Sequence, residues 1–365
     1  MVVRRVVLAP AIVLVTVALL GVLPLLVLGA AFAVRWLPGR WRGLRLLWFL
    51  LVYLVRESVG LIALFVLWVA CGFGWKMRAD RFQRAHVVLV GWFLHGLTGS
   101  AHKVLGLRIV TEDLPGHLAV EHPFGPASAE GHAPVLVFSR HAGAGDSFLL
   151  VDLLVNTYGR RPHIVLKDLL QFDPCIDTAL NRLPNRFISP DPPPGAGVID
   201  SIAALAGGLE GDGALILFPE GGNFTERRRR AAIDRLAGAG LDHLVPLAEE
   251  LTQVLPPRPG GAFAAIDAAP GADVLFVAHT GLEQLSTVGD LWRGLPMRDE
   301  VRMTWWLVPA ADVPAAHDER VRWLYHWWER IDTWIEDHRW AAVPAGPKLR
   351  DGRPGAPGGG PPPVA

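Results

Sequence analysis

The chain has few cysteines, no net charge and no cluster of metal ligands, and each shortage excludes a class of protein. Its 365 residues include two cysteines, Cys71 and Cys175, which are too few for a disulfide framework. No Cys/His cluster has the spacing of a zinc site. The 35 basic and 35 acidic residues balance, so no basic field favours nucleic acid. We therefore expect neither a metal site nor a nucleic-acid partner.

Hydrophobic residues make up 51% of the chain, and the excess lies at the N-terminus. Val6–Val34 carries no charge and exceeds the ~20 residues that cross a hydrocarbon core. Leu46–Trp75 is a second apolar stretch, interrupted by Arg56 and Glu57. Adjacent charges are costly at mid-bilayer. This stretch predicts a second span, a kinked or shallow helix, or a hairpin with the first within one leaflet.

Basic residues follow both apolar stretches, so charge does not decide between these arrangements. The basic residues in question are Arg35, Arg40, Arg42 and Arg45 after the first stretch, and Lys76, Arg78, Arg81 and Arg84 after the second. Two spans and two segments dipping in from the cytoplasm leave the rest of the chain on the same side. We expect a membrane-bound protein whose main domain is cytoplasmic.

From about Leu105 short apolar runs alternate with helical patterns, which is typical of an α/β domain. We expect a mixed, largely parallel sheet flanked by helices and preceded by N-terminal membrane helices. Strands are predicted at Leu107–Val110, Val135–Phe138, Ile164–Leu166, Ala214–Phe218, Val254–Leu255, Val274–Ala278 and Val301–Val308. Helices are predicted at Asp146–Thr157, Val198–Leu209, Thr225–Ala237, Gly261–Ala268 and Ala315–Trp340.

Three parts of the chain are predicted: membrane-anchoring segments over 1–84, the main domain over 85–345, and a disordered Pro/Gly-rich tail over 346–365. Asp191–Gly195 is a proline-rich loop. His86–His102 is either an interface-lying amphipathic helix or a packing helix of the domain. The tryptophan-rich pattern of Ala315–Trp340 leaves two alternatives, contact with lipid or closure of the core.

A histidine and an aspartate follow the apolar run Pro134–Phe138. His141 and Asp146 are five positions apart on a predicted strand-to-helix turn, which places a general base beside an orienting carboxylate. A histidine with its reference pKa of about 6.5 works as a base near neutrality. Asp146 is also suited to capping the helix that follows. The small residues of 142–145 let backbone N–H groups approach an oxyanion or a phosphate.

Two other patterns bear on this site. His163 and Asp168 have the same spacing, but His163 lies in a predicted strand with Asp168 at its exit, so we interpret that pair as structural. No serine lies in a Gly-x-Ser-x-Gly elbow, so a serine nucleophile is not expected. A second motif, Phe218-Pro219-Glu220-Gly221, follows the apolar run Ala214–Leu217.

His141-x4-Asp146, the later Phe218-Pro219-Glu220-Gly221 and the hydrophobic N-terminus together resemble the glycerophospholipid acyltransferase family. The resemblance implies that His141 activates a lipid hydroxyl directly and that Asp146 orients it. It also implies that Glu220 and Gly221 belong to the acceptor site. The acyl donor would be acyl-CoA or acyl carrier protein, and no cofactor would be required.

The family pattern Phe-Pro-Glu-Gly-Thr-Arg is altered here, because Gly222 and Asn223 stand at its last two positions. Arg258, in the block Leu255–Gly261, is a candidate for the missing positive charge, as is one of Arg227 to Arg230. An arginine fork suits phosphate oxygens, although most of this arginine run also fits a solvated helix face. Phe-Thr-Glu and the block around Arg258 resemble the lysophosphatidic and lysocardiolipin acyltransferase branch.

Two more basic residues occupy positions that resemble family blocks. Lys167 lies in Lys-Asp-Leu after the predicted strand Ile164–Leu166, and Arg186 precedes an apolar pair in Asn185–Ser189. Both are candidates to bind the acceptor phosphate, and both also fit surface charges.

The sequence thus predicts a membrane-bound acyltransferase that acts on a lysophospholipid, with 1-acylglycerol-3-phosphate as the leading acceptor. Its partners would be the bilayer, that acceptor and the acyl donor. Two alternatives stay open: a thioester or ester hydrolase on the same site, and a non-catalytic membrane lipid-binding protein.

Overall fold

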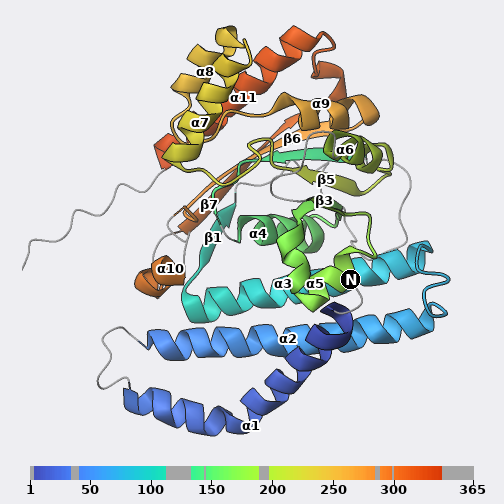
Figure 1. Ribbon diagram of the computed structural model, residues 1–365, viewed down its shortest axis with the longest axis vertical. Helices are drawn as coiled ribbons and strands as arrows, with labels where there is room; N and C mark the ends of the chain where they lie inside the picture. The colour runs from blue at the N-terminus through green and yellow to red at the C-terminus, as the bar shows by residue number, and fades with distance from the viewer. Residues whose placement is uncertain are drawn as a thin grey trace, which may run out of the picture.

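The computed structural model describes residues 4–33, 41–111, 133–143, 145–188, 197–283, 288–297 and 300–338. A seven-stranded sheet forms the centre of the molecule, in the order β1-β7-β6-β2-β5-β3-β4 (Figure 1). Neighbouring strands are parallel except β6 and β7, which are antiparallel. This confirms the predicted mixed, largely parallel sheet. The strands are β1 (Arg108–Thr111), β2 (Val135–Ser139), β3 (Arg161–Lys167), β4 (Arg186–Ile188), β5 (Gly213–Leu217), β6 (Asp273–Thr280) and β7 (Glu300–Val308).

The central strands are apolar throughout because both faces of the sheet are covered. Every residue of β2 and β5 is buried. Val135 and Val137 of β2 pack into one core cluster, whereas Leu136 and Phe138 pack into the cluster on the other face. Because β2 pairs in parallel with β5 and β6, the carboxyl ends of the three strands meet at one edge of the sheet, where ligands bind in open α/β folds.

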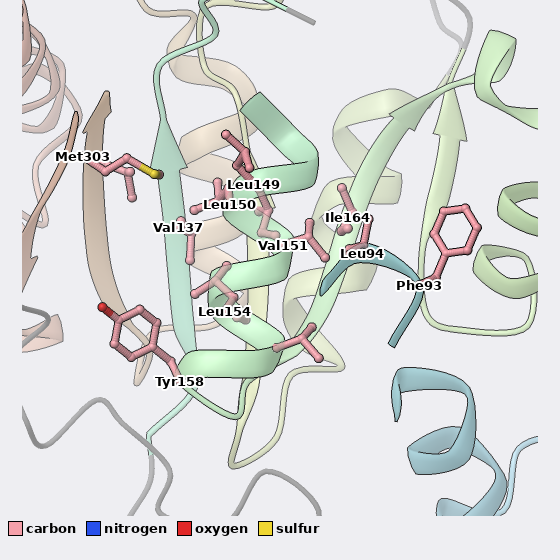
Figure 2. Packing of buried hydrophobic residues seen from close by; sticks show 14 of the residues in the cluster. Phe93, Leu94, Val137, Leu149, Leu150, Val151, Leu154, Tyr158, Ile164 and Met303 are labelled. Carbon is pink, nitrogen blue, oxygen red and sulfur yellow. The ribbon is translucent and has the colours of Figure 1, made fainter. Parts of the chain in front are cut away.

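Helices form a layer on each face of the sheet. One core cluster includes residues of α3 (Asp80–Ser100), α4 (Asp146–Asp152) and α5 (Pro174–Leu180). Figure 2 shows Leu149, Leu150 and Leu154 packed beside Val137 in this cluster. The other cluster includes residues of α6 (Val198–Gly207), α8 (Val245–Glu250), α9 (Pro259–Ala268) and α11 (His317–His338). The remaining helices are α1 (Ala9–Ala33), α2 (Arg42–Ala70), α7 (Glu226–Gly238) and α10 (Val288–Gly294), with the short η1 (Arg4–Leu8), η2 (Ala101–Leu105), η4 (Leu153–Thr157), η5 (Asp168–Phe172), η6 (Asp242–Leu244) and η7 (Ala310–Asp312).

Two N-terminal helices lie outside this layered domain, on the side of α3 (Figure 1). The segments Arg5–Phe32 and Arg42–Ala70 are each long and apolar enough to cross a membrane. α1 is apolar around its whole circumference and largely exposed, which suits a lipid environment. α2 packs between α1 and α3.

The adjacent charges of α2 do not interrupt the helix. α2 is continuous from Arg42 to Ala70. The Arg56 guanidinium lies 4.4 Å from the centre of the Trp92 ring and donates to the Trp92 carbonyl. Glu57 is fully buried, and its Oε1 accepts from the Cys175 backbone N–H at 2.9 Å. Both charged side chains therefore have partners in the domain.

One predicted strand is wrong and one strand was missed. Val254–Leu255 forms no strand because side chains take its backbone N–H groups. Asp332 accepts from Val254 at 3.1 Å, and Glu220 accepts from Leu255 at 2.9 Å. The missed strand, β4, has three residues at the sheet edge and pairs only with β3 among the described residues. Such a short segment carries no readable alternation.

The two helices with alternative interpretations both pack against the domain. α3 buries Phe82, Val87, Phe93 and Leu94, which makes it a packing helix. The predicted boundary between residues 84 and 85 falls inside it. α11 buries Leu324, Trp328, Ile331 and Ile335, and it lies at the opposite end of the molecule from α1 (Figure 1). Of the two alternatives for this helix, closure of the core is therefore the one that the structure supports. The predicted loop Asp191–Gly195, Trp340 and the tail 346–365 lie outside the described residues.

Candidate active site

His141 and Asp146 meet at the carboxyl end of β2. The strand ends at Ser139, and Asp146 is the first residue of α4. His141 Nδ1 and Asp146 Oδ2 are 2.8 Å apart. Because an ionised carboxylate only accepts, this contact fixes the proton on Nδ1, and neutral His141 then has an unprotonated Nε2. His141 also lines a pocket. The geometry thus provides a base with a defined tautomer.

The carboxylate of Asp146 is held in its charged form. Its Oδ2 also accepts from the backbone N–H of Ala142 at 2.9 Å and of Gly143 at 3.3 Å. Burial alone would raise the pKa of Asp146, but the bond from His141, the nearby histidines and these N–H donors lower it to about 2. The predicted donation from the 142–145 turn to substrate is therefore wrong for Ala142 and Gly143, which donate to Asp146.

Asp146 also differs from the predicted helix cap. Gly145, with a φ of 100°, occupies the N-cap position. Asp146 follows it, and its Oδ1 accepts from the Ser147 backbone N–H at 2.6 Å. One carboxylate oxygen thus binds the first turn of α4, and the other binds His141.

Glu220 supports the base from the turn that follows β5. It is 2% exposed, and its two oxygens accept from the backbone N–H groups of His141 and Leu255, each at 2.9 Å. Burial raises the pKa of Glu220 to about 7, against the opposing effects of Arg140 and the two backbone donors. Glu220 thus joins the His141 and Leu255 backbones, and it does not line the pocket that contains His141. The Phe218 ring lies over the His141 ring, with centres 4.6 Å apart.

A pocket of about 650 Å³ extends from His141 into the layer between the sheet and α3. Its walls combine α3, the start of α4, the end of β3, α5 and the start of α6. Apolar side chains dominate the walls, including Leu89, Val90, Phe93, Leu94, Val151, Ile164, Leu166, Ile176, Leu180 and Ile202. Such a space suits a hydrocarbon chain better than a polar ligand.

The predicted basic residues divide into those at the pocket and those outside it. Lys167 and Arg258 both line the pocket, as does Gly221. A Cβ atom built on Gly221 would lie 2.9 Å from the Arg258 guanidinium carbon, and its φ is 69°. Gly221 therefore permits the arginine to approach. Arg186 is exposed and does not line the pocket, since its Nε donates to Ser201 at 3.2 Å. The structure does not bring Arg186 to the site.

Three arginines of the run in α7 have different partners. Arg229 donates to the carbonyls of Leu251 and Glu249, and Arg230 binds Glu226 at 2.9 Å. Arg228 approaches the Gly222 turn and donates to the Asn223 carbonyl at 3.1 Å. Of the run, Arg228 is therefore the residue directed toward the site.

The second histidine–aspartate pair does not form a site. His163 is buried in β3, and burial lowers its pKa to about 4. Asp168 is exposed and accepts from Gln171 at 3.2 Å.

Two buried residues beside the site were missed in the sequence. Arg140 precedes His141, and His279 Nε2 lies 3.9 Å from Asp146 Oδ2. His279 is the second-last residue of β6, far along the chain, and nothing in the sequence shows that this strand neighbours β2. Among the described residues, no group of three or more His, Cys, Asp or Glu side chains could hold a metal ion.

Residues 123–280 match the family model described as Acyltransferase. The matched segment contains His141, Asp146, Glu220 and Arg258 and ends after β6. No curated protein and no solved structure matches the chain. The match supports acyl transfer as the chemistry of this segment. The lysophosphatidic or lysocardiolipin branch stays a prediction.

Proposed function

We propose that this protein is a membrane-bound O-acyltransferase. It moves a fatty acyl group from acyl-CoA or acyl carrier protein to the hydroxyl of a lysophospholipid, with 1-acylglycerol-3-phosphate as the leading acceptor. The observation that supports this most is the His141–Asp146 dyad at an apolar pocket of about 650 Å³. A base beside a hydrocarbon-sized space fits a reaction between two lipidic substrates.

In the proposed reaction, His141 Nε2 removes the proton of the acceptor hydroxyl as its oxygen attacks the thioester carbonyl carbon. The new C–O bond forms and the C–S bond breaks, and the departing thiolate takes the proton from His141. Asp146, ionised above a pKa of about 2, stabilises the imidazolium formed in between. The products are the acylated lipid and the free thiol of the carrier, and no acyl-enzyme forms.

The pocket is assigned to the acyl chain, and its width should influence chain-length preference. Val90 of α3 lines the pocket, whereas Val88 is 39% exposed two residues away. We expect Val90→Phe to lower kcat/KM for long-chain donors by about tenfold relative to short-chain donors, because a ring occupies space that the chain needs. Competition between two acyl-CoA chain lengths measures this. Val88→Phe is the matched control, and equal preferences in both variants would remove Val90 from the chain site.

Arg258 and Lys167 are assigned to the acceptor phosphate. Both line the pocket that contains His141, and a guanidinium forms paired bonds with phosphate oxygens. Arg258 stands close to Gly221, two residues before Asn223, which occupies the position of the family motif arginine. Arg228 lies near the adjacent Gly222 and adds positive charge to the same turn.

Replacing Arg258 should reduce activity toward phosphate-bearing acceptors more than activity toward neutral ones. We expect Arg258→Ala to lower kcat/KM for a phosphate-bearing acceptor by roughly ten- to a hundredfold, since a charge-assisted hydrogen bond contributes that much. A neutral monoacylglycerol should lose much less. Arg227→Ala is the control, because Arg227 is exposed on the same basic run. An equal loss for both acceptors in Arg258→Ala would exclude this contact.

Membrane attachment is assigned to α1 and α2, both long and apolar enough to cross a bilayer. A bilayer supplies the acceptor, and we place the catalytic domain on the cytoplasmic side, where thioester donors are found. The function is tested by supplying labelled acyl-CoA, or acyl carrier protein, to the reconstituted full chain with a panel of lysophospholipids. A diacyl product from one phosphate-bearing acceptor supports the proposal. Absence of product from every acceptor with both donors would refute it.

A further inference from the structure

A buried charged network lies directly behind the dyad and takes no part in the mechanism above. Arg140 is 1% exposed and His279 is 2% exposed. Arg140 forms an ion pair with Glu283, whose other oxygen accepts from the Gly281 backbone N–H at 2.7 Å. Burying an arginine and a histidine costs desolvation energy that apolar residues would avoid. The network therefore calls for a role beyond filling the core.

Arg140 and His279 bind each other's main chain. The Arg140 guanidinium donates to the His279 carbonyl at 2.7 Å and to the Gln253 carbonyl at 3.1 Å. His279 Nε2 is 3.1 Å from the Arg140 carbonyl. These contacts fix the end of β6 against the end of β2, at the residue before His141.

The His141 backbone is consequently held from three directions. The preceding carbonyl accepts from His279, the His141 N–H donates to Glu220 at 2.9 Å, and the His141 carbonyl accepts from the Phe224 N–H at 3.0 Å. Removing one of these bonds leaves the histidine peptide less firmly held. The imidazole would then move relative to both Asp146 and the substrate.

The protonation state of His279 suits this contact. Burial, together with the positive charge of Arg140, lowers the pKa of His279 to about 4, so the ring is neutral at pH 7. Its single proton belongs on Nε2, because the Arg140 carbonyl can only accept. Nδ1 is buried without a hydrogen-bond partner in the described structure. A neutral donor holds the backbone here without placing a second positive charge beside Asp146.

We propose that His279 is a positioning residue for the base, which fixes the His141 peptide through the Arg140 carbonyl while Arg140 and Glu283 fix His279. The inference rests on the proposed acyl transfer. It assigns a role in catalysis to a residue of β6, which lies outside both the His141–Asp146 motif and the Phe218–Gly221 motif.

Two substitutions of His279 separate positioning from packing. His279→Gln keeps a side-chain N–H near the position of Nε2, whereas His279→Leu keeps the bulk and removes the donor. In the full-length protein, we expect His279→Leu to lower kcat by about ten- to a hundredfold, with KM for both substrates nearly unchanged, because small displacements of a catalytic group have effects of this size. His279→Gln should restore kcat to within a few fold. Equal kcat in His279→Leu and the unsubstituted protein would overturn the inference, as would equal losses in both variants.

A second readout is independent of turnover. The Nδ1 proton of His141 reports its bond to Asp146 in an NMR spectrum of histidine-labelled protein, and His141→Ala assigns the signal. We expect His279→Leu to shift or broaden this signal and His279→Gln to preserve it. An unchanged signal in His279→Leu contradicts positioning. If the unsubstituted protein transfers no acyl group but the signal responds as expected, the proposed function fails and the positioning contact stands.

Discussion

Replacing His141 with alanine should reduce acyl transfer by about a thousandfold, within the range that a positioned general base contributes. The variant lacks the imidazole whose Nδ1 contacts Asp146 at 2.8 Å. The acceptor hydroxyl then has no base as it attacks the thioester. Binding should largely persist, because the apolar side chains that line the pocket and Arg258 are unchanged, so the loss should appear mainly in kcat. Steady-state rates with labelled acyl donor measure it.

The matched control for this variant is His163→Gln. His163 has the same spacing to an aspartate, but it is buried in β3 and its Asp168 accepts from Gln171. We expect near-normal transfer from the control once the amount of folded protein is equalised by its thermal unfolding curve. Similar activity in His141→Ala and His163→Gln would show that the dyad is not the base.

Asp146→Asn should lower kcat by about a thousand- to ten-thousandfold, comparable to the loss when an asparagine replaces the aspartate of a serine-protease triad. The amide retains one acceptor oxygen but presents N–H groups where His141 Nδ1–H and the Ala142 N–H both donate. The imidazole then loses its fixed tautomer and the stabilisation of its charged form. KM for the donor should change little, because asparagine has nearly the same shape as aspartate and the apolar side chains that line the pocket are unchanged.

The pH dependence of folding stability gives a second test of the Asp146→Asn variant. The native pKa of Asp146, about 2, lies below that of an unfolded aspartate, so its charged form stabilises the folded state above pH ~4, and this contribution is lost as the pH falls through 2. The Asn variant should therefore be less stable at neutral pH and show a smaller decline in stability toward acid. Asp168→Asn, at an exposed carboxylate, should not alter activity. Normal kcat in Asp146→Asn would refute the orienting role.

The sequence was sufficient for the elements that form the site and for its central pair. Continuous apolar runs predicted β2 and β5, because strands covered on both faces bury every residue. The positions of His141 and Asp146 between an apolar run and a helix then placed them at the carboxyl edge of the sheet. The family model over residues 123–280 agrees with this interpretation at the level of an acyltransferase domain.

Contacts between distant segments were not predictable. Glu220 was predicted to bind the acceptor, and the structure shows its two oxygens bonded to the His141 and Leu255 backbones. The bond from the Leu255 N–H also takes a backbone donor that a strand at Val254–Leu255 would need. Arg186 was expected at the phosphate, but the short edge strand β4 directs it to Ser201. The position of His279 beside the site was not predicted, because the local sequence pattern does not determine the order of strands in a sheet. The charge of Glu57 within the apolar stretch has its explanation in a contact distant in sequence, the bond from the Cys175 N–H.

The fate of the labelled acyl group tests the central claim most directly. The full-length protein in vesicles receives acyl-CoA labelled in its acyl chain, with and without 1-acylglycerol-3-phosphate, and the lipids are separated after the reaction. The account predicts label in the diacyl product only when the acceptor is present, with release of an equal amount of free CoA thiol. Label released as free fatty acid at the same rate without acceptor would contradict it, and would make water the natural acceptor at His141.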